Sequence, residues 1–257
     1  MKKNRKIIIC VISAVLVLLI IWRLADYKAG FGQNAVDAGG ERQICYLLNI
    51  DGMGGLGHVA FMLEDTDGSG ILYSYNGMQY DLKACLLGKE GVGKMKVFEL
   101  DKDDVANLYK TGMVSVSDVS ECDDFDRIIF RSISEEEYLM VAESVQEYIA
   151  AGDRYEELFA IMANAAVTDK ANAQAELDAY ASRDDLPKYN IYKHNCDTVA
   201  RKVIAEIDDG MAGFNENNSR LIPSNNCRKM SKVLKNGWNK AMLGEDTLKE
   251  RILWFIL

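Results

Sequence analysis

The chain has 257 residues, of which 49% are hydrophobic and 27% charged, with 20 glycines and only 2 prolines. This composition excludes a collagen-like or proline-rich disordered chain and leaves ample apolar residues for a packed core. The formal net charge is −9. Basic residues are concentrated before residue 29, so the rest of the chain is more acidic still. Phosphate contacts need clustered Lys and Arg, and we therefore expect no nucleic-acid partner.

The N-terminal segment has the pattern of a membrane anchor. Four basic residues lie within 1–6, and an uncharged apolar run over 7–22 follows, which Arg23 closes. Spans usually take about 17–25 residues, so we place a single-pass transmembrane helix at 7–25. The positive charges predict a cytoplasmic N-terminus over 1–6 and an extracytoplasmic domain at the cell membrane. The alternative is a cleaved signal peptide, although no small-x-small cleavage site follows Trp22.

Strand signals dominate the next part of the chain. Residues 26–42 are polar and contain glycines, as in a stalk between an anchor and a domain. Five runs then have strand character, and an Asp/Gly/Ser-rich turn over 64–70 joins the second to the third. These runs are 44–50, 58–63, 71–76, 95–100 and 127–133.

Helical patterns follow the strands. Ser134 and Glu137 form a capping-box signature, and we predict a helical insertion over about 134–185. An extended piece over 189–193 leads into a helix from Cys196 to about residue 208. Strands first and helices later predict an α+β fold, with helices packed on an antiparallel sheet in one domain over 43–257.

The C-terminal tail combines a basic segment, 227–244, with an apolar end, 252–257. We expect a terminal helix that packs on the core, because most apolar termini do so. The alternative is contact with the anchoring membrane through the basic face and the apolar end. The sequence does not indicate an oligomeric state.

Three glycine- or aspartate-rich motifs lack the context that their ligands require. Residues 52–57 match G-x-G-x-x-G, but a strand-like run follows where a dinucleotide site needs a helix. Residues 88–95 have Met95 where a phosphate loop needs a hydroxyl, and residues 65–76 end in Asn76 where a calcium loop needs Glu. With two histidines and no C-x-x-C spacing, a zinc site is also disfavoured. We expect no cofactor and no metal.

One constellation has the chemistry of a cysteine nucleophile. Cys196 begins a predicted helix, whose unpaired N–H groups lower a thiol pKa, and Asn195 is the expected N-cap. His58 begins a strand and would activate the thiol, provided that a polar side chain orients the imidazole. Ser74 and Asn76 share one face of the following strand, so either residue could hold the ring.

The same residues carry a resemblance to a known group of enzymes. The segments GHVAF (57–61), LYSY (72–75) and YNIYKHNCDT (189–198) resemble circularly permuted papain-like cysteine hydrolases. That group includes NlpC-like cell-wall peptidases and relatives of lecithin:retinol acyltransferase. The resemblance spans roughly 44–210, and in permuted members the histidine strand precedes the cysteine helix, as it does here.

The resemblance implies a bacterial thiol peptidase or amidase in which Cys196 is the nucleophile and His58 the general base. Its substrate would be a peptide or amide, with cell-wall stem peptides the nearest class. No motif of the group secures the third polar residue. Two alternatives therefore remain: a non-catalytic binding module on an inactivated hydrolase fold, and an acyltransferase that acts on lipid.

Other candidates are weaker. His194 lies two residues before Cys196, so its side chain would point away from the thiol along an extended segment. Cys227 is a rival nucleophile in front of another predicted helix, but no histidine lies near it in the sequence. The remaining cysteines of the domain are expected to be small buried residues: Cys45, Cys85 and Cys122.

Overall fold

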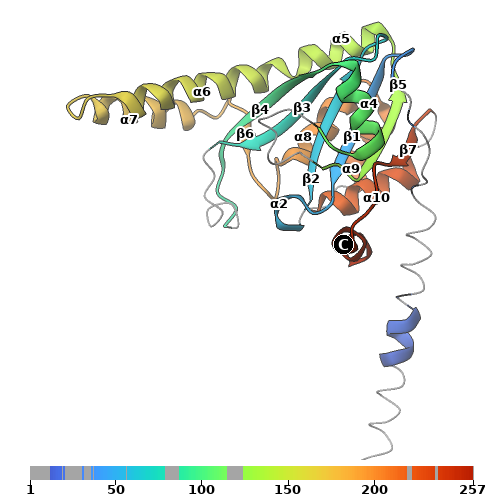
Figure 1. Ribbon diagram of the computed structural model, residues 1–257. Helices are drawn as coiled ribbons and strands as arrows, with labels where there is room; N and C mark the ends of the chain where they lie inside the picture. The colour runs from blue at the N-terminus through green and yellow to red at the C-terminus, as the bar shows by residue number, and fades with distance from the viewer. Residues whose placement is uncertain are drawn as a thin grey trace, which may run out of the picture.

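The computed structural model describes residues 12–18, 20, 31, 36, 38–55, 57–78, 87–114, 124–218, 222–234 and 237–256 (Figure 1). Its centre is a seven-stranded antiparallel sheet with the order β6-β4-β3-β2-β1-β5-β7. The strands are β1 (Gln43–Asn49), β2 (His58–Glu64), β3 (Gly70–Gly77), β4 (Gly91–Leu100), β5 (Arg127–Ser132), β6 (Lys188–Tyr189) and β7 (Asn239–Met242).

Helices come mainly from the second half of the chain, which confirms the predicted α+β class. The helices of the domain are α2 (Gly52–Gly55), α4 (Lys102–Thr111), α5 (Glu135–Ser144), α6 (Gln146–Asn164), α7 (Lys170–Ala181), α8 (Cys196–Ala205), α9 (Asp209–Asn218), α10 (Pro223–Val233) and α11 (Leu248–Ile256). The five predicted strand runs correspond to β1 through β5. Of the extended piece expected over 189–193, only Tyr189 belongs to a strand, and residues 191–193 form a turn. Strands β6 and β7 are short and lie at the sheet edges, and the sequence did not indicate β7.

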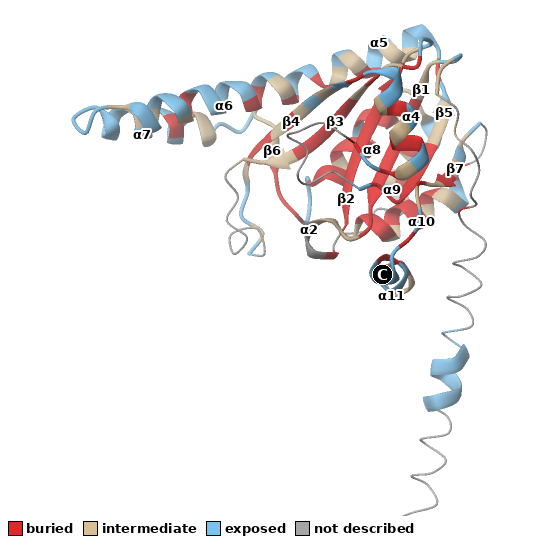
Figure 2. Ribbon diagram, in the orientation of Figure 1, coloured by how far each residue is buried: buried red, intermediate tan, exposed pale blue. Residues whose placement is uncertain are grey.

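The sheet buries both of its faces, as Figure 2 shows for the central strands. Alternate residues of each strand enter different cores, because strand side chains point to opposite faces with period two. In β1, Tyr46 and Leu48 belong to the first core, which includes residues of α5, α6, α8, α9, α10 and α11. Cys45 and Leu47 belong to the second core, which α4 covers.

Helix α4 was not predicted from the sequence, although its signals are present. Asp101 caps it and forms a capping box with Asp104. Gly112 ends it in the left-handed conformation with φ 79°. A Cβ at Gly112 would lie 2.1 Å from the carbonyl oxygen of Phe125, so only glycine fits this reversal.

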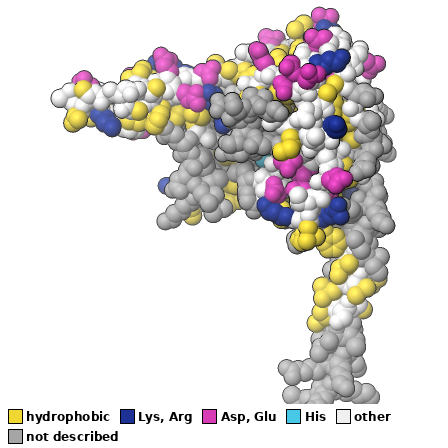
Figure 3. All heavy atoms as spheres, in the orientation of Figure 1, with side chains coloured by type: hydrophobic (Ala, Val, Ile, Leu, Met, Phe, Trp, Pro, Cys, Tyr) yellow, Lys and Arg dark blue, Asp and Glu magenta, His cyan; other side chains and the backbone are white. Residues whose placement is uncertain are grey.

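The predicted insertion is helical, and its capping box at Ser134 and Glu137 is confirmed. The continuous helix expected after residue 153 is interrupted at 165–169, and α6 and α7 form an arm that projects from the body (Figure 1). A hydrogen bond of 3.1 Å from the hydroxyl of Tyr180 to the carbonyl of Ala151 links the two helices. Acidic side chains gather over α5 (Figure 3).

Only part of the N-terminal region is described. Of the anchor expected at 7–25, residues 12–18 and 20 are helical and exposed. Within the described residues, no helix combines the length and apolar character that a bilayer crossing requires. Much of the stalk at 26–42 lies outside the described residues, as do Cys10, Cys85 and Cys122.

The C-terminal helix α11 packs on the core, as expected from its apolar sequence. Trp254 is 4% exposed and belongs to the first core. The guanidinium of Arg228 lies 4.7 Å from the centre of the Trp254 ring, a cation–π contact. Phe31 meets the same ring edge-on at 5.7 Å.

A buried ion pair fixes the segment before α11 to the sheet. Both terminal nitrogens of Arg127 donate to Asp246 at 2.6 Å, and both side chains are 1% exposed.

Asp246→Ala should lower the free energy of unfolding by about 3–5 kcal/mol, because it leaves a buried guanidinium without its carboxylate. Urea denaturation measures this change. Asp185→Ala removes an exposed pair with Arg183 and should cost less than about 1 kcal/mol; equal losses would contradict the prediction.

Candidate functional site

The structure brings His58, Ser74 and Asn76 together on β2 and β3. Nε2 of His58 lies 3.0 Å from Oγ of Ser74. The amide nitrogen of Asn76 donates to the same Oγ at 3.0 Å. The register pairs Ala60 with Ser74, so the imidazole reaches its partner diagonally across the two strands. Of the two residues expected to hold the ring, Ser74 contacts it and Asn76 supports Ser74.

Burial controls the protonation of His58. The side chain is 1% exposed, and burial, reinforced by the positive charge of Lys96, lowers its pKa to about 4. The imidazole is therefore neutral at physiological pH and has one ring nitrogen available as a proton acceptor. The same shift makes it a weaker base than an ordinary histidine.

Cys196 is the first residue of α8. Oδ1 of Asn195 accepts a hydrogen bond of 3.0 Å from the backbone N–H of Thr198, which confirms the expected N-cap. The amide nitrogen of Asn195 also donates to the carbonyl of Ile191 at 2.9 Å, so the cap is itself held in place. Cys196 is 2% exposed and belongs to the first core. Its backbone position favours the thiolate, whereas its burial favours the thiol.

The segment that leads into α8 and the side of β2 that begins with His58 lie at the same end of the sheet. Helix α8 packs against β2 and β3. The strand that precedes α8, β6, pairs with the first residues of β4, and Gly93 of β4 pairs with Gly77 at the end of β3. His58, the first residue of β2, is at this level, because the register Ala60–Ser74 places it opposite Asn76.

The faces of the sheet separate the two residues. By the alternation of β2, His58 shares the face of Ala60 and Met62, which belong to the second core. Cys196 belongs to the first core, together with Val59 and Phe61. A thiol–imidazole contact therefore requires the two groups to meet around the end of β2. The pairing of Cys196 with His58 stays a prediction.

The structure shows where the other candidate residues lie. His194 is exposed, and its backbone bridges to Asn190 in the turn before α8. Cys227 lies inside α10 and not in front of it, so the helix-start argument for its reactivity was wrong. Burial also raises the pKa of the Cys227 thiol, which disfavours the reactive thiolate. Cys45 is buried, as expected, with its sulfur 3.4 Å from the hydroxyl of Tyr109.

A buried network around Asp197 was not anticipated from the sequence. The carboxylate of Asp197 accepts a hydrogen bond of 2.7 Å from the hydroxyl of Tyr46 on β1. It also accepts two from Arg201, at 3.0 and 2.9 Å, and one from the amide of Asn226 on α10. Asp197 is fully buried, so these donors compensate its lost hydration. The i,i+4 spacing of Asp197 and Arg201 was the available sequence signal.

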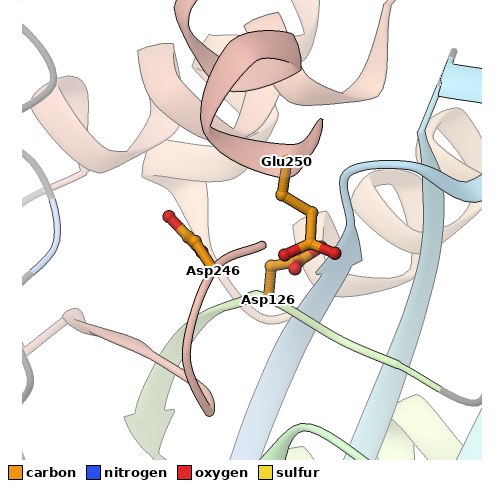
Figure 4. A group of neighbouring side chains, drawn as sticks. All are labelled: Asp126, Asp246 and Glu250. Carbon is orange, nitrogen blue, oxygen red and sulfur yellow. The ribbon is translucent and has the colours of Figure 1, made fainter. Parts of the chain in front are cut away.

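Three buried carboxylates are the one group among the described residues with the spacing of a metal site (Figure 4). One carboxylate oxygen from each of Asp126, Asp246 and Glu250 lies within 4.8 Å of the other two; Figure 4 shows the three side chains. Arg127 supplies the counter-charge of Asp246, and backbone N–H groups donate to Asp126 and Glu250. Burial raises the pKa of Asp126 to about 8, with Glu250 adding to the shift. A proton bound at Asp126 therefore reduces the negative charge that a cation would otherwise neutralise, and we do not assign a metal.

The burial of His58 predicts a pH-dependent stability. Its ordinary pKa of 6.5 falls to about 4 in the folded chain, so the unfolded state binds more protons between these values and stability is lost as the pH falls through this window. The difference corresponds to about 3 kcal/mol at the acidic limit. Urea denaturation from pH 7 to 4 should show a shallower decline for His58→Gln than for the wild type. His194→Gln, at an exposed site, is the control; identical slopes for all three proteins would refute the assignment.

Asp126 predicts the opposite pH dependence. Its folded pKa of about 8 exceeds the ordinary 3.8, so the folded state binds more protons between these values. Stability is therefore lost as the pH rises from about 4 to 8. Asp126→Asn keeps an acceptor for the N–H of Ile50, 2.6 Å from Oδ2, and removes the charge. Its melting temperature should exceed that of the wild type at pH 9 and match it near pH 4. A loss of stability at pH 9 would contradict a protonated Asp126.

Comparisons of the chain with protein-family models, with curated proteins and with solved structures gave no match. The assignment of function therefore depends on the residues of this chain and on their positions in the fold.

Proposed function

We propose that the protein is a membrane-anchored, outward-facing cysteine hydrolase that cleaves amide or peptide bonds, with a permuted papain-like domain. The observation that carries the proposal is the hydrogen bond between His58 and Ser74 at the sheet end where α8 begins with Cys196. An imidazole oriented through Nε2 leaves Nδ1 for the thiol, which is the division of roles that a cysteine–histidine pair needs.

The chemistry assigns a role to each side chain. His58 takes the proton of the Cys196 thiol, and the thiolate attacks the carbonyl carbon of the substrate. His58 returns the proton to the departing amine, and an acyl-thioester forms on Cys196. Water, deprotonated by His58, then attacks the thioester and releases the acid and the thiol. Backbone N–H groups in the first turn of α8 are placed to stabilise the oxyanion.

The membrane location comes from the charge pattern of the sequence. The basic residues in 1–6 and the apolar run in 7–22 favour a single-pass anchor at 7–25 with the domain outside the cytoplasm. That location makes peptides of the cell envelope the nearest substrate class. The 134–185 helices lie beside β4 and α8, where they are able to restrict access to the site.

A second candidate is a non-catalytic binding module. The alternation of β2 favours this function, because it places His58 and Cys196 on opposite faces of the sheet. In such a module His58, Ser74 and Asn76 stabilise the end of the β2–β3 hairpin, and Cys196 is a small core residue. Ligand binding that survives both Cys196→Ala and His58→Ala would favour it.

Iodoacetamide labelling of the full-length chain against pH distinguishes the two functions. Mass spectrometry reads each cysteine separately, and Cys45 and Cys227 are internal controls because burial raises their thiol pKa values. In a hydrolase, Cys196 reacts well below pH ~8.5, the value for an ordinary thiol. His58→Gln should slow that labelling at least about tenfold, by loss of the base that takes the thiol proton.

The accompanying variants separate orientation from folding. Ser74→Ala should reduce Cys196 labelling less than His58→Gln does, because it removes the orienting partner and keeps the base. His194→Gln should leave labelling unchanged. Equal reactivity of Cys196 with and without His58, in variants that retain their circular dichroism, would exclude the hydrolase. Muropeptides and phospholipid vesicles then test which acyl group a reactive Cys196 accepts.

A further inference from the structure

Helix α11 uses only one of its faces to pack on the core. Glu250 and Trp254, one turn apart, are both 4% exposed and form the inner face. Leu248 is 75% exposed, Ile252 is 49% exposed and Phe255 is half-buried. At 3.6 residues per turn, these three apolar side chains fall within about 60° of the helix circumference, on the side away from Trp254. They form an apolar outer stripe on α11 that stays largely exposed.

Basic side chains flank this outer stripe. Lys249 lies along one edge of it and Arg251 along the other, and both are exposed. Glu250, the one acidic residue of α11, is buried. Lys249 pairs with Asp51 at 2.6 Å, whereas no ion pair within the described residues engages Arg251. Figure 3 shows hydrophobic side chains at this end of the body with Lys and Arg side chains on either side.

The length of the chain ties α11 to the expected anchor. Phe31 is buried, meets the ring of Trp254 edge-on at 5.7 Å and has the ammonium of Lys240 over its own ring at 5.8 Å. The anchor expected at 7–25 ends only a few residues before Phe31. That much chain spans at most roughly 20 Å when fully extended. An anchor that crosses the bilayer therefore holds α11 within about two helix diameters of the membrane surface.

A second copy of the chain fits the outer stripe less well than a membrane does. A two-fold contact through α11 would bring Lys249 and Arg251 close to their own counterparts, and like charges repel. The same two cations attract the phosphate groups of anionic lipids. An apolar stripe with a basic residue along each edge is the pattern of a helix that lies in the membrane interface.

We propose that α11 is an interfacial helix, whose outer stripe inserts among the head groups of the bilayer that holds the anchor, with anionic phospholipids as its preferred partner. Leu248, Ile252 and Phe255 enter the boundary between head groups and acyl chains, and Lys249 and Arg251 bind phosphate groups beside them. The arm of α6 and α7 lies at the other end of the body, so it points away from the membrane (Figure 2). This proposal rests on the anchor of the proposed function, and not on Cys196 or His58.

Tryptophan fluorescence of the full-length chain in lipid nanodiscs tests the proposal. The discs contain phosphatidylcholine and phosphatidylglycerol, either plain or brominated near the head-group end of the acyl chains, because bromine quenches tryptophans that it contacts. In a Trp22→Phe background, Leu248→Trp adds a reporter to the outer stripe, and Val167→Trp adds one to the arm, where Val167 is 93% exposed. Bromination should quench the Leu248→Trp reporter at least threefold more than the Val167→Trp reporter. Equal quenching of the two would overturn the proposal.

Charge variants test the preference for anionic lipid. Adding Lys249→Gln/Arg251→Gln should lower the quenching of the Leu248→Trp reporter at least twofold, as should discs of phosphatidylcholine alone. Arg154→Gln/Lys170→Gln removes the same two kinds of charge from exposed positions of the arm and should leave the quenching unchanged. Quenching that persists without Lys249 and Arg251 would show that charge does not select the lipid, which contradicts that part of the proposal.

Trp22 distinguishes a failure of this proposal from a failure of the anchor. Bromination should reduce the fluorescence of the wild type more than that of Trp22→Phe, because Trp22 lies in the expected anchor. If it does not, both the anchor and the role of α11 are wrong. If Trp22 is quenched and the Leu248→Trp reporter is not, the anchor stands and α11 does not contact lipid. A Leu248→Trp reporter that neither brominated lipid nor aqueous iodide quenches would show that a second copy covers the stripe, which also overturns the proposal.

Discussion

The buried carboxylate of Asp197 is the interaction on which the position of α8 depends. One side chain connects the first turn of α8 to Tyr46 in the middle of β1, to Arg201 one turn further along, and to Asn226 on α10. A fully buried charge is stable only while all these donors are in place. The network therefore permits little movement at the start of α8. Cys196 precedes Asp197 directly, so its backbone position is fixed by the same hydrogen bonds.

The same arrangement explains why the candidate catalytic residues are so inaccessible. Both faces of the sheet are covered by other elements. Polar side chains from neighbouring strands therefore approach solvent-facing segments at the strand ends. His58 and Asn76 are at such an end, and Cys196 is at the start of the helix that covers one face. Catalysis at this site therefore requires the Cys196 thiol and the His58 imidazole to meet around the end of β2, because strand alternation directs them to opposite faces of the sheet.

Local signals in the sequence were sufficient to predict most helices and strands, but not which face of the sheet a helix covers. The capping box at Ser134 and the N-cap at Asn195 depend on residues three apart, and the alternation of β1 to β3 depends on residues two apart. The edge strands β6 and β7 are two and four residues long, too short for any periodicity. The face on which α8 packs depends on the pairing of β6 with β4, residues nearly a hundred positions apart. The sequence therefore predicted that Cys196 begins a helix and that Ser74 or Asn76 holds His58, but not which face receives the thiol.

The charge of the molecule also has one part that the sequence shows and one part that depends on the fold. The net charge of −9 is visible in the sequence and favours repulsion of acidic partners. Most of that charge is solvated and screened within about 8 Å at physiological ionic strength. Folding changes the surroundings of a few of these charges, because it buries Asp197 beside Arg201 and Asp246 beside Arg127. The acidic composition therefore does not itself select a ligand.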